Sequence, residues 1–218
     1  MNDIARSYIG SLSARTLFRR SALWSAIGPM RGMTALDVGC GTGGPASFIF
    51  KREGVKAIGL DIFMASLIVA RENDAYQEFV CGDATFLPFR DNCVEASGSV
   101  ATLEHLDRQG GEKLLRELER VAKSVVVVCC PVGSWRQGPY GDNQYQEHKY
   151  VWSLDELRRE GFTNIKGIGL KGMSGKLWGK VMRSPLGPIL GLLSLAGTLL
   201  SYRNPRIASN VVCWKHVN

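Results

Sequence analysis

The sequence lacks the features that mark several specialised classes of protein. It has no internal repeat, no low-complexity stretch and only 8 proline residues among 218. Its composition, 45% hydrophobic and 22% charged, is too apolar for a disordered chain and too irregular in order for a fibre or a coiled coil. These absences leave one ordinary folded domain over residues 1–218, long enough to bury a core of several layers.

Cysteine pairs of the metal-binding and redox kind are also absent. None of the six cysteines belongs to a C-x-x-C pair, which excludes zinc ribbons and thioredoxin-type redox sites, so no metal ligand set is expected. The N-terminal segment contains no apolar core of the length that a signal peptide needs. A reduced, cytoplasmic compartment is therefore expected.

Acidic residues are missing from the C-terminal part of the chain. None follows Glu160, although eight Lys and Arg residues do. The net charge of +7 is accordingly uneven, with a slightly acidic middle at 32–131 between two basic ends. This asymmetry indicates an anionic partner, but no nucleic-acid-binding module is visible, so nucleic acid is not the expected partner.

No apolar run is long enough to cross a membrane. The longest, Leu186–Leu200, has 15 residues interrupted by glycine and proline, whereas a transmembrane helix needs about 20. It lies in a basic and apolar insertion at 171–208, for which two interpretations stay open. One is a helix that packs in the core or forms a homodimer. The other is an apolar patch, flanked by Lys and Arg, that makes peripheral contact with an anionic membrane.

Short β-rich runs alternate with amphipathic stretches through the middle of the chain. This alternation requires a sheet of mostly parallel strands, because each helix must cross back over the sheet. We therefore predict an α/β fold: a doubly wound, mostly parallel seven-stranded Rossmann-like sheet with helices on both faces. Strands are expected at 34–38, 55–60, 78–81, 94–97, 124–129, 164–170 and 210–217, and helices at 44–53, 63–74, 111–122 and 153–160.

Composition divides this single domain into three parts. Residues 1–31 are arginine-rich with apolar residues at helical spacing, which predicts an N-terminal helical lid. Residues 32–131 are expected to form the cofactor-binding core. Residues 132–218 are expected to supply an acceptor-side loop, the last strands and the insertion at 171–208.

The strongest motif is a glycine-rich turn, Leu36–Gly44, at the end of the first predicted strand. Glycines there permit a tight turn and a close approach of a ligand to the backbone. Gly39, Gly41 and Gly44 match the dinucleotide fingerprint. Tyr145 and Lys149 have the spacing of the tyrosine–lysine pair in short-chain dehydrogenases, so a NAD-dependent oxidoreductase is one alternative.

Three observations favour a different ligand. Asp37, two residues before the first glycine, would repel a pyrophosphate but suits a positively charged amino group. Asp61 and Asp83 end the next two predicted strands, where they could accept hydrogen bonds from a ribose and an exocyclic amine. Tyr145 and Lys149 follow several turn residues, which predicts a loop instead of the helix that a dehydrogenase needs.

Five segments resemble the successive motifs of class I S-adenosylmethionine-dependent methyltransferases, in the same order. They are Leu36–Gly44, Leu60–Ile62, Gly82–Ala84, Leu87–Phe89 and Leu103–Leu106. The resemblance covers residues 34–130 and implies S-adenosyl-L-methionine as the cofactor.

The same resemblance implies roles for individual residues. The methionine moiety would be held by Asp37, Gly39 and Gly41, with Gly43 opening the following helix. Asp61 would bind the ribose hydroxyls and Ile62 would pack on the adenine. Asp83 would accept from the adenine amino group, Ala84 would offer its backbone amide, and Ser99, just past the fourth strand, would lie near the sulfonium.

The activity that the resemblance implies is in-line transfer of a methyl group to a small-molecule acceptor, and the membrane-contact interpretation of the insertion at 171–208 would suit a lipid-like one. A base is needed only if the acceptor must lose a proton first. The candidate catalytic residues, near the expected mouth of the site, are His148, Tyr145 and His105. Two further alternatives stay open: a methyltransferase acting on nucleic acid or protein, and a non-catalytic S-adenosylmethionine-binding partner subunit.

Overall fold

A computed structural model describes most of the chain's middle and its C-terminal strands. The described residues are 21–22, 25, 32–44, 54–133, 138, 143–171 and 196–217. Nearly all of the expected lid at 1–31, the helix expected over 44–53 beyond Gly44, and most of the insertion at 171–208 lie outside them.

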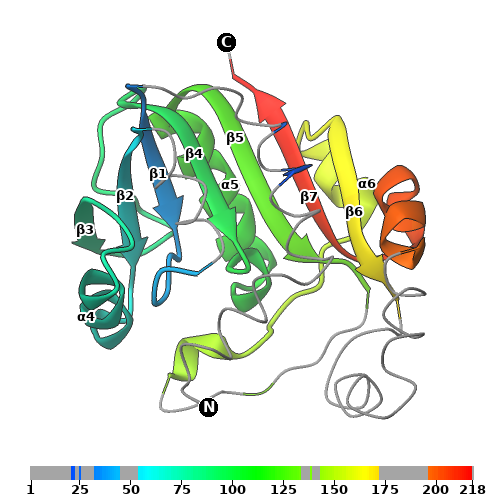
Figure 1. The fold of residues 1–218 in the computed structure, drawn as a ribbon, viewed down its shortest axis with the longest axis horizontal. Coiled ribbons are helices and arrows are strands. Elements are labelled where there is room, and N and C mark those ends of the chain that lie inside the picture. Colours follow the sequence, from blue (N-terminus) through cyan, green and yellow to red (C-terminus); the bar gives the residue numbers. More distant parts are fainter. Residues whose placement is uncertain are drawn as a thin grey trace.

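A seven-stranded sheet with the order β3-β2-β1-β4-β5-β7-β6 forms the centre of the protein (Figure 1). Strand β7 alone runs antiparallel to the other six strands, so the expected mostly parallel sheet is confirmed. The strands are β1 (Thr34–Val38), β2 (Lys56–Asp61), β3 (Glu78–Cys81), β4 (Val94–Val100), β5 (Ala122–Pro131), β6 (Asn164–Leu170) and β7 (Ala208–His216).

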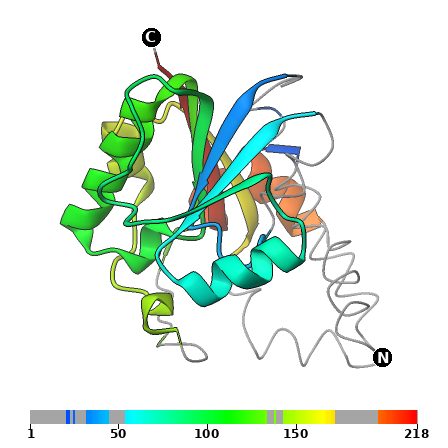
Figure 2. The same ribbon diagram turned by 90° about the vertical axis from the view of Figure 1, so that its left-hand side faces the viewer.

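Helices cover both faces of the sheet, as the doubly wound fold requires (Figure 2). Helix α4 (Met64–Glu72) packs its buried Leu67 and Ala70 into the apolar core on one face. Helix α5 (Arg108–Val121) packs its leucines into the core on the other face, together with Leu157 of α6 (Leu154–Arg159). Three short 3-10 helices connect these elements: η1 (Leu103–His105), η2 (Gln144–Gln146) and η3 (Pro205–Ile207).

Strand β5 explains why the run Val125–Val128 is apolar throughout. It lies between β4 and β7, and none of these four valines exposes more than 5% of its surface. A strand covered on both faces cannot alternate apolar and polar side chains, because each face meets a layer of helices.

The edge strand β6 carries a helix over residues 196–203, which is the C-terminal part of the predicted insertion (Figure 1). Gly167 permits this contact, since a Cβ at that position would collide with the backbone carbonyl of Ser201. Thr198 and Ser201 are buried, whereas Leu199 and Leu200 are 51% and 62% exposed. Among the described residues, no helix combines the length and apolarity that crossing a bilayer would require.

Several element boundaries differ from the sequence-based expectation by one to three residues, and two of these differences have a clear structural cause. Helix α5 begins at Arg108, three residues early, because the Asp107 side chain accepts a hydrogen bond from the amide of Gly110 and caps the first turn. Strand β4 continues to Val100, since its pairing with β5 extends as far as Cys129. Ser99 therefore lies inside the strand, not past it.

Helix α6 begins with a capping box. The Ser153 side chain accepts from the amide of Glu156, and the Glu156 carboxylate accepts in return from the Ser153 amide and hydroxyl. A further hydrogen bond comes from the Tyr150 hydroxyl, at 2.6 Å. The bond from Ser153, followed by the one from Tyr150, lowers the pKa of Glu156 from its usual 4.5 to about 2.

We expect Ser153→Ala to lower the free energy of unfolding by about 1 kcal/mol at neutral pH, because it removes a helix cap. The lowered pKa means that the folded state favours the ionised form of Glu156. The stability that this adds to the fold is fully present above about pH 4.5 and is lost as the pH falls from about 4.5 towards 2. The gap between wild type and variant should therefore narrow in acid, as measured by urea unfolding. Ser124→Ala, at an exposed position of β5, is the control. An equal gap at neutral and acidic pH would contradict the capping role of this carboxylate.

Candidate active site

A cavity of about 310 Å³ opens at the carboxyl edge of the parallel strands. In Figure 1 the arrowheads of β1, β4 and β5 point toward the side of the sheet where η2 lies. The walls come from four strand ends and from η1 and η2, and include Gly41, Asp61, Asp83, Thr102, His105 and Tyr145. Ligands bind at this edge of open α/β sheets, and the volume lies within the range of small-molecule sites.

The glycine-rich turn after β1 has a left-handed backbone at two glycines, and Gly39 has little room beside it. Gly39 and Gly41 have φ angles of 75° and 54°, a region that residues with a Cβ rarely adopt. A Cβ on Gly39 would also collide with the side chain of Thr102, whose hydroxyl bonds the carbonyls of Val38 and Gly39 at 3.3 Å. The turn therefore requires glycine for two independent reasons.

The amides of this turn already have acceptors. Those of Gly39 and Cys40 donate to the carbonyl of Leu60, at 2.7 and 3.0 Å, and that of Gly43 donates to Cys40. The Gly41 amide donates to the Asp61 carboxylate at 2.8 Å. A dinucleotide-binding turn uses free amides to hold a pyrophosphate, so this arrangement does not favour one.

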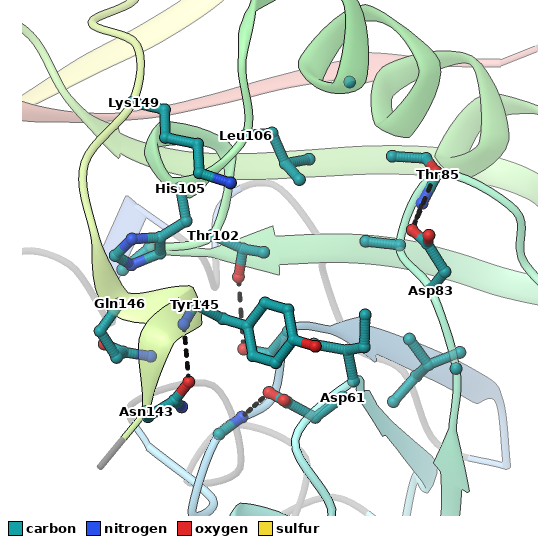
Figure 3. A pocket seen from close by; sticks show the side chains of 18 of the residues that line it. Asp61, Asp83, Thr85, Thr102, His105, Leu106, Asn143, Tyr145, Gln146 and Lys149 are labelled. Atoms are coloured by element: carbon teal, nitrogen blue, oxygen red, sulfur yellow. Dashed lines mark hydrogen bonds between the residues drawn. The ribbon is translucent and has the colours of Figure 1, made fainter. Parts of the chain in front are cut away.

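Asp61, at the end of β2, holds two neighbouring segments and faces the cavity (Figure 3). One carboxylate oxygen accepts from Gly41, and the other accepts from the amide of Phe63 at the start of α4, also at 2.8 Å. A carboxylate offers about four lone-pair positions, so Asp61 retains the capacity to accept from a ligand hydroxyl. Ile62 also lines the cavity and is 41% exposed.

Asp83, after β3, lines the cavity together with Ala84. Its side chain accepts from the amide and the hydroxyl of Thr85, at 2.7 and 2.8 Å, which fixes the carboxylate in a local turn. Asp61 and Asp83 thus reach the same cavity from adjacent strands, as the sequence predicts.

Asp37 has a different environment. It is 4% exposed, accepts a 2.5 Å hydrogen bond from the Tyr76 hydroxyl, and does not line the cavity. Burial raises its pKa from 3.8 to about 7, against the opposing hydrogen bond from Tyr76 and with a smaller contribution from the charge of Asp61. The expected contact between Asp37 and a methionine amino group stays a prediction.

The position expected of Ser99 is taken by its neighbours. Ser99 is fully buried in β4, and its hydroxyl has no hydrogen-bond partner among the residues that the structure describes. Ala101 and Thr102 follow the strand and line the cavity instead. Ala101 has a φ of 59°, which is strained for a residue with a Cβ, and its amide is held by the carbonyl of Cys129 at 2.8 Å. Nothing in the sequence marks Ala101 as unusual.

The three candidate catalytic residues gather at one end of the cavity. His105 lines it, and its Nδ1 lies 3.0 Å from the carbonyl oxygen of Glu147. The rings of His105 and His148 meet edge to face, with centroids 4.9 Å apart. Tyr145 extends from η2 across the cavity on the side of Asp61 (Figure 3), 6.5 Å from the ring of Phe63 between centroids.

Burial lowers the pKa of His105 below its usual value, partly offset by the contact with the Glu147 carbonyl. The imidazole is therefore neutral at physiological pH. Tyr145 lies in a 3-10 turn and Lys149 lies beyond it, so the predicted absence of a helix joining them is confirmed.

Several lining residues were not identified from the sequence. They are Thr102, Leu106, Asp107, Gly110, Asn143, Gln146 and Lys149. The sequence indicates Lys149 only as part of the dehydrogenase alternative. Asp107 carries a recognisable signal as a helix cap. Gly110 lies in α5 and Gln146 in η2, and the others lie in loops, where no periodic pattern indicates which side chains face a ligand.

A comparison with known protein families identifies the kind of domain that this fold and cavity belong to. Residues 36–130 match the protein family described as "Methyltransferase domain". Residues 36–130 thus carry a methyltransferase domain, which agrees with the resemblance found in the sequence.

Individual relatives are methyltransferases of small molecules by name. The chain is 33% identical over 161 residues to a sterol 24-C-methyltransferase of Aspergillus fumigatus, covering 66% of this chain and 41% of the relative. It is 31% identical over 127 residues to a demethylmenaquinone methyltransferase of Renibacterium salmoninarum, covering 56% and 52%. The chain thus spans about half the length of these relatives or less.

The fold is also similar to that of a solved enzyme. The structure of geranyl diphosphate C-methyltransferase from Streptomyces coelicolor matches with a TM-score of 0.60 and 18% identity, over 92% of this chain and 78% of that one. At this identity the likeness concerns the fold.

Because the raised pKa of Asp37 favours its protonated form in the folded state, stability should fall as the pH rises from about 4 through 7. Asp37→Asn removes this titration. We expect wild type to lose stability relative to Asp37→Asn between pH 5 and pH 8, as measured by urea unfolding at both values. Asp155→Asn, at an exposed position of α6, is the control and should keep the wild-type dependence. Parallel curves for wild type and Asp37→Asn would show that Asp37 does not titrate in this range.

Proposed function

We propose that this protein binds S-adenosyl-L-methionine in the cavity at the carboxyl edge of the sheet and transfers its methyl group to a small, lipid-like acceptor. The observation that carries the proposal is the placement of Asp61 and Asp83, which end adjacent strands and face one cavity together with the glycine-rich turn. Acceptors at this spacing suit the ribose and the adenine of one nucleoside.

The hydrogen bonds within the glycine-rich turn favour a nucleoside ligand that carries no phosphate groups. The amides of Gly39, Cys40 and Gly41 are already bonded within the protein, which leaves a pyrophosphate without its usual donors. The carboxylate of Asp61 would also repel a phosphate at this place. Both arguments favour a cationic sulfonium ligand over NAD.

The proposed reaction needs little chemistry from the protein. The acceptor's electron pair forms a bond to the methyl carbon, while the carbon–sulfur bond breaks and its electrons neutralise the sulfonium, giving S-adenosylhomocysteine. Any proton on the acceptor passes to a base or to water. The contribution of the chain is to align the acceptor, the methyl carbon and the sulfur. The residues placed to do so are Tyr145, His105 and His148 at the η1–η2 end.

A lipid-like acceptor is supported by the names of two relatives, a sterol 24-C-methyltransferase and a demethylmenaquinone methyltransferase.

We expect Asp61→Ala to weaken the binding of S-adenosylhomocysteine by about 1.5–3 kcal/mol, or about 10- to 150-fold, because a ribose would lose hydrogen bonds in a partly buried site. Isothermal titration calorimetry measures this change. Asp155→Ala is the control, and urea unfolding of Asp61→Ala checks that loss of its two backbone bonds has not unfolded the turn. Binding of NAD by the wild type, with no affinity for S-adenosylhomocysteine, would overturn the proposed cofactor.

Peripheral membrane contact is the second part of this proposal. In the helix at 196–203, Leu199 and Leu200 are exposed. Arg203 lies one helical turn further on, and Arg206 follows three residues later. This segment therefore exposes both apolar and basic side chains. Wild type should float with anionic vesicles and not with neutral ones.

The double variant Leu199→Ser, Leu200→Ser should lose that flotation, because it removes the apolar part of the contact. Val151→Ser changes an exposed apolar residue elsewhere and is the control. Failure of the wild type to float with anionic vesicles at low salt would contradict membrane contact without bearing on the cofactor.

A further inference from the structure

Three side chains with metal-ligating atoms lie together beside the η1–η2 end of the cavity, and one of them, His105, lines it. They belong to Glu104, His105 and His148, and one ligand atom from each lies within 4.8 Å of the others. Glu104 is 3% exposed, and the two imidazoles are half-buried. A small inward movement of these side chains would bring all three atoms to the 2.0–2.2 Å bond lengths of a divalent metal ion.

His105 already has the outer contact that metal-ligating histidines generally show. Its Nδ1 lies 3.0 Å from the carbonyl oxygen of Glu147, which can accept the ring proton. When Nδ1 carries the proton, Nε2 has the lone pair that a metal binds, and the backbone carbonyl holds the ring in its orientation.

The backbone holds the two contributing segments together before any ion binds. The carbonyl of Glu104 accepts hydrogen bonds from the amides of Lys149 and Tyr150, at 2.8 and 3.2 Å. Glu104 and His105 lie in η1, and His148 directly precedes the first of these donors. The three ligands are therefore joined by main-chain contacts across about 44 residues of sequence.

We propose that Glu104, His105 and His148 form a binding site for a divalent transition metal ion of the Zn²⁺ or Co²⁺ kind at the acceptor end of the cavity. Two imidazoles and one carboxylate suit these ions, whereas Mg²⁺ and Ca²⁺ prefer oxygen ligands alone. Three protein ligands leave at least one coordination position open.

His105 lines the cavity, so an ion bound to it can reach an oxygen of a bound molecule. Figure 3 shows the Lys149 side chain extending along the same end of the cavity, near His105. The ion and the ammonium group together would make this end positive, which favours an acceptor that presents an anionic oxygen. This last point rests on the proposed function; the metal site itself does not.

The test is a Co²⁺ titration of the full chain purified without a histidine tag, followed by visible absorption and by Zn²⁺ competition. We expect one Co²⁺ per chain, displaced by Zn²⁺, with no thiolate charge-transfer band. His148→Ala and, separately, Glu104→Gln should each weaken Co²⁺ binding more than about tenfold, since even outer contacts of metal sites contribute that much.

Two controls separate this site from other donors. His216→Ala removes the remaining histidine, which is exposed on β7, and Cys81→Ser removes the exposed thiol. Both should bind Co²⁺ as the wild type does. Wild-type protein that binds no Co²⁺, or variants of His148 and Glu104 that fold normally by circular dichroism and bind it unchanged, would overturn the proposal.

Calorimetry with S-adenosylhomocysteine on the same preparations keeps the two proposals distinct. Absence of Co²⁺ binding with normal S-adenosylhomocysteine binding refutes the metal site alone. Co²⁺ binding at this site by a protein that does not bind S-adenosylhomocysteine refutes the cofactor alone.

Discussion

The carboxylate of Asp61 is the contact on which the architecture of the cavity depends. It accepts one amide from the glycine-rich turn after β1 and one from the first residues of α4, so a single side chain fixes three consecutive segments of the sheet edge. An anionic acceptor shared by two backbone amides is stronger than a neutral one. The same group faces the cavity, so the interaction that shapes the site also presents its charge to a ligand.

The other end of the cavity, at η1 and η2, is formed largely by a loop. Main-chain contacts hold this loop in place. The Glu104 carbonyl binds two successive amides after η2, and the Glu147 carbonyl contacts His105, so η1 and the loop hold each other. Glu104 is buried, and a buried carboxylate is stable only with a compensating partner or ion. Side chains that need such compensation concentrate where chemistry takes place.

The cofactor side of the site could be predicted from the sequence because strand ends have local signals. An apolar run followed by Asp61 or Asp83 places that acid at the sheet edge, and glycines mark the turn. The exposure of Asp37 and the end of β4 could not be predicted, because each depends on pairing with a distant segment. Tyr76 covers Asp37 from 39 residues away, and Cys129 extends the pairing of β4. The geometry at Ala101 follows from that pairing.

The three acids at the ends of β1, β2 and β3 are therefore not equivalent, although the sequence presents them alike. Asp61 and Asp83 keep backbone partners and reach the cavity, whereas Asp37 is enclosed with Tyr76 and titrates near neutrality. The charge of Asp61 acts on Asp37, and protonation of Asp37 removes the repulsion between the two carboxylates. A ligand that brings a positive charge would favour the ionised form again, so the charge of the turn can follow occupancy of the cavity. A neutral or anionic nucleotide offers no such compensation, and this asymmetry favours a sulfonium ligand independently of the glycine pattern.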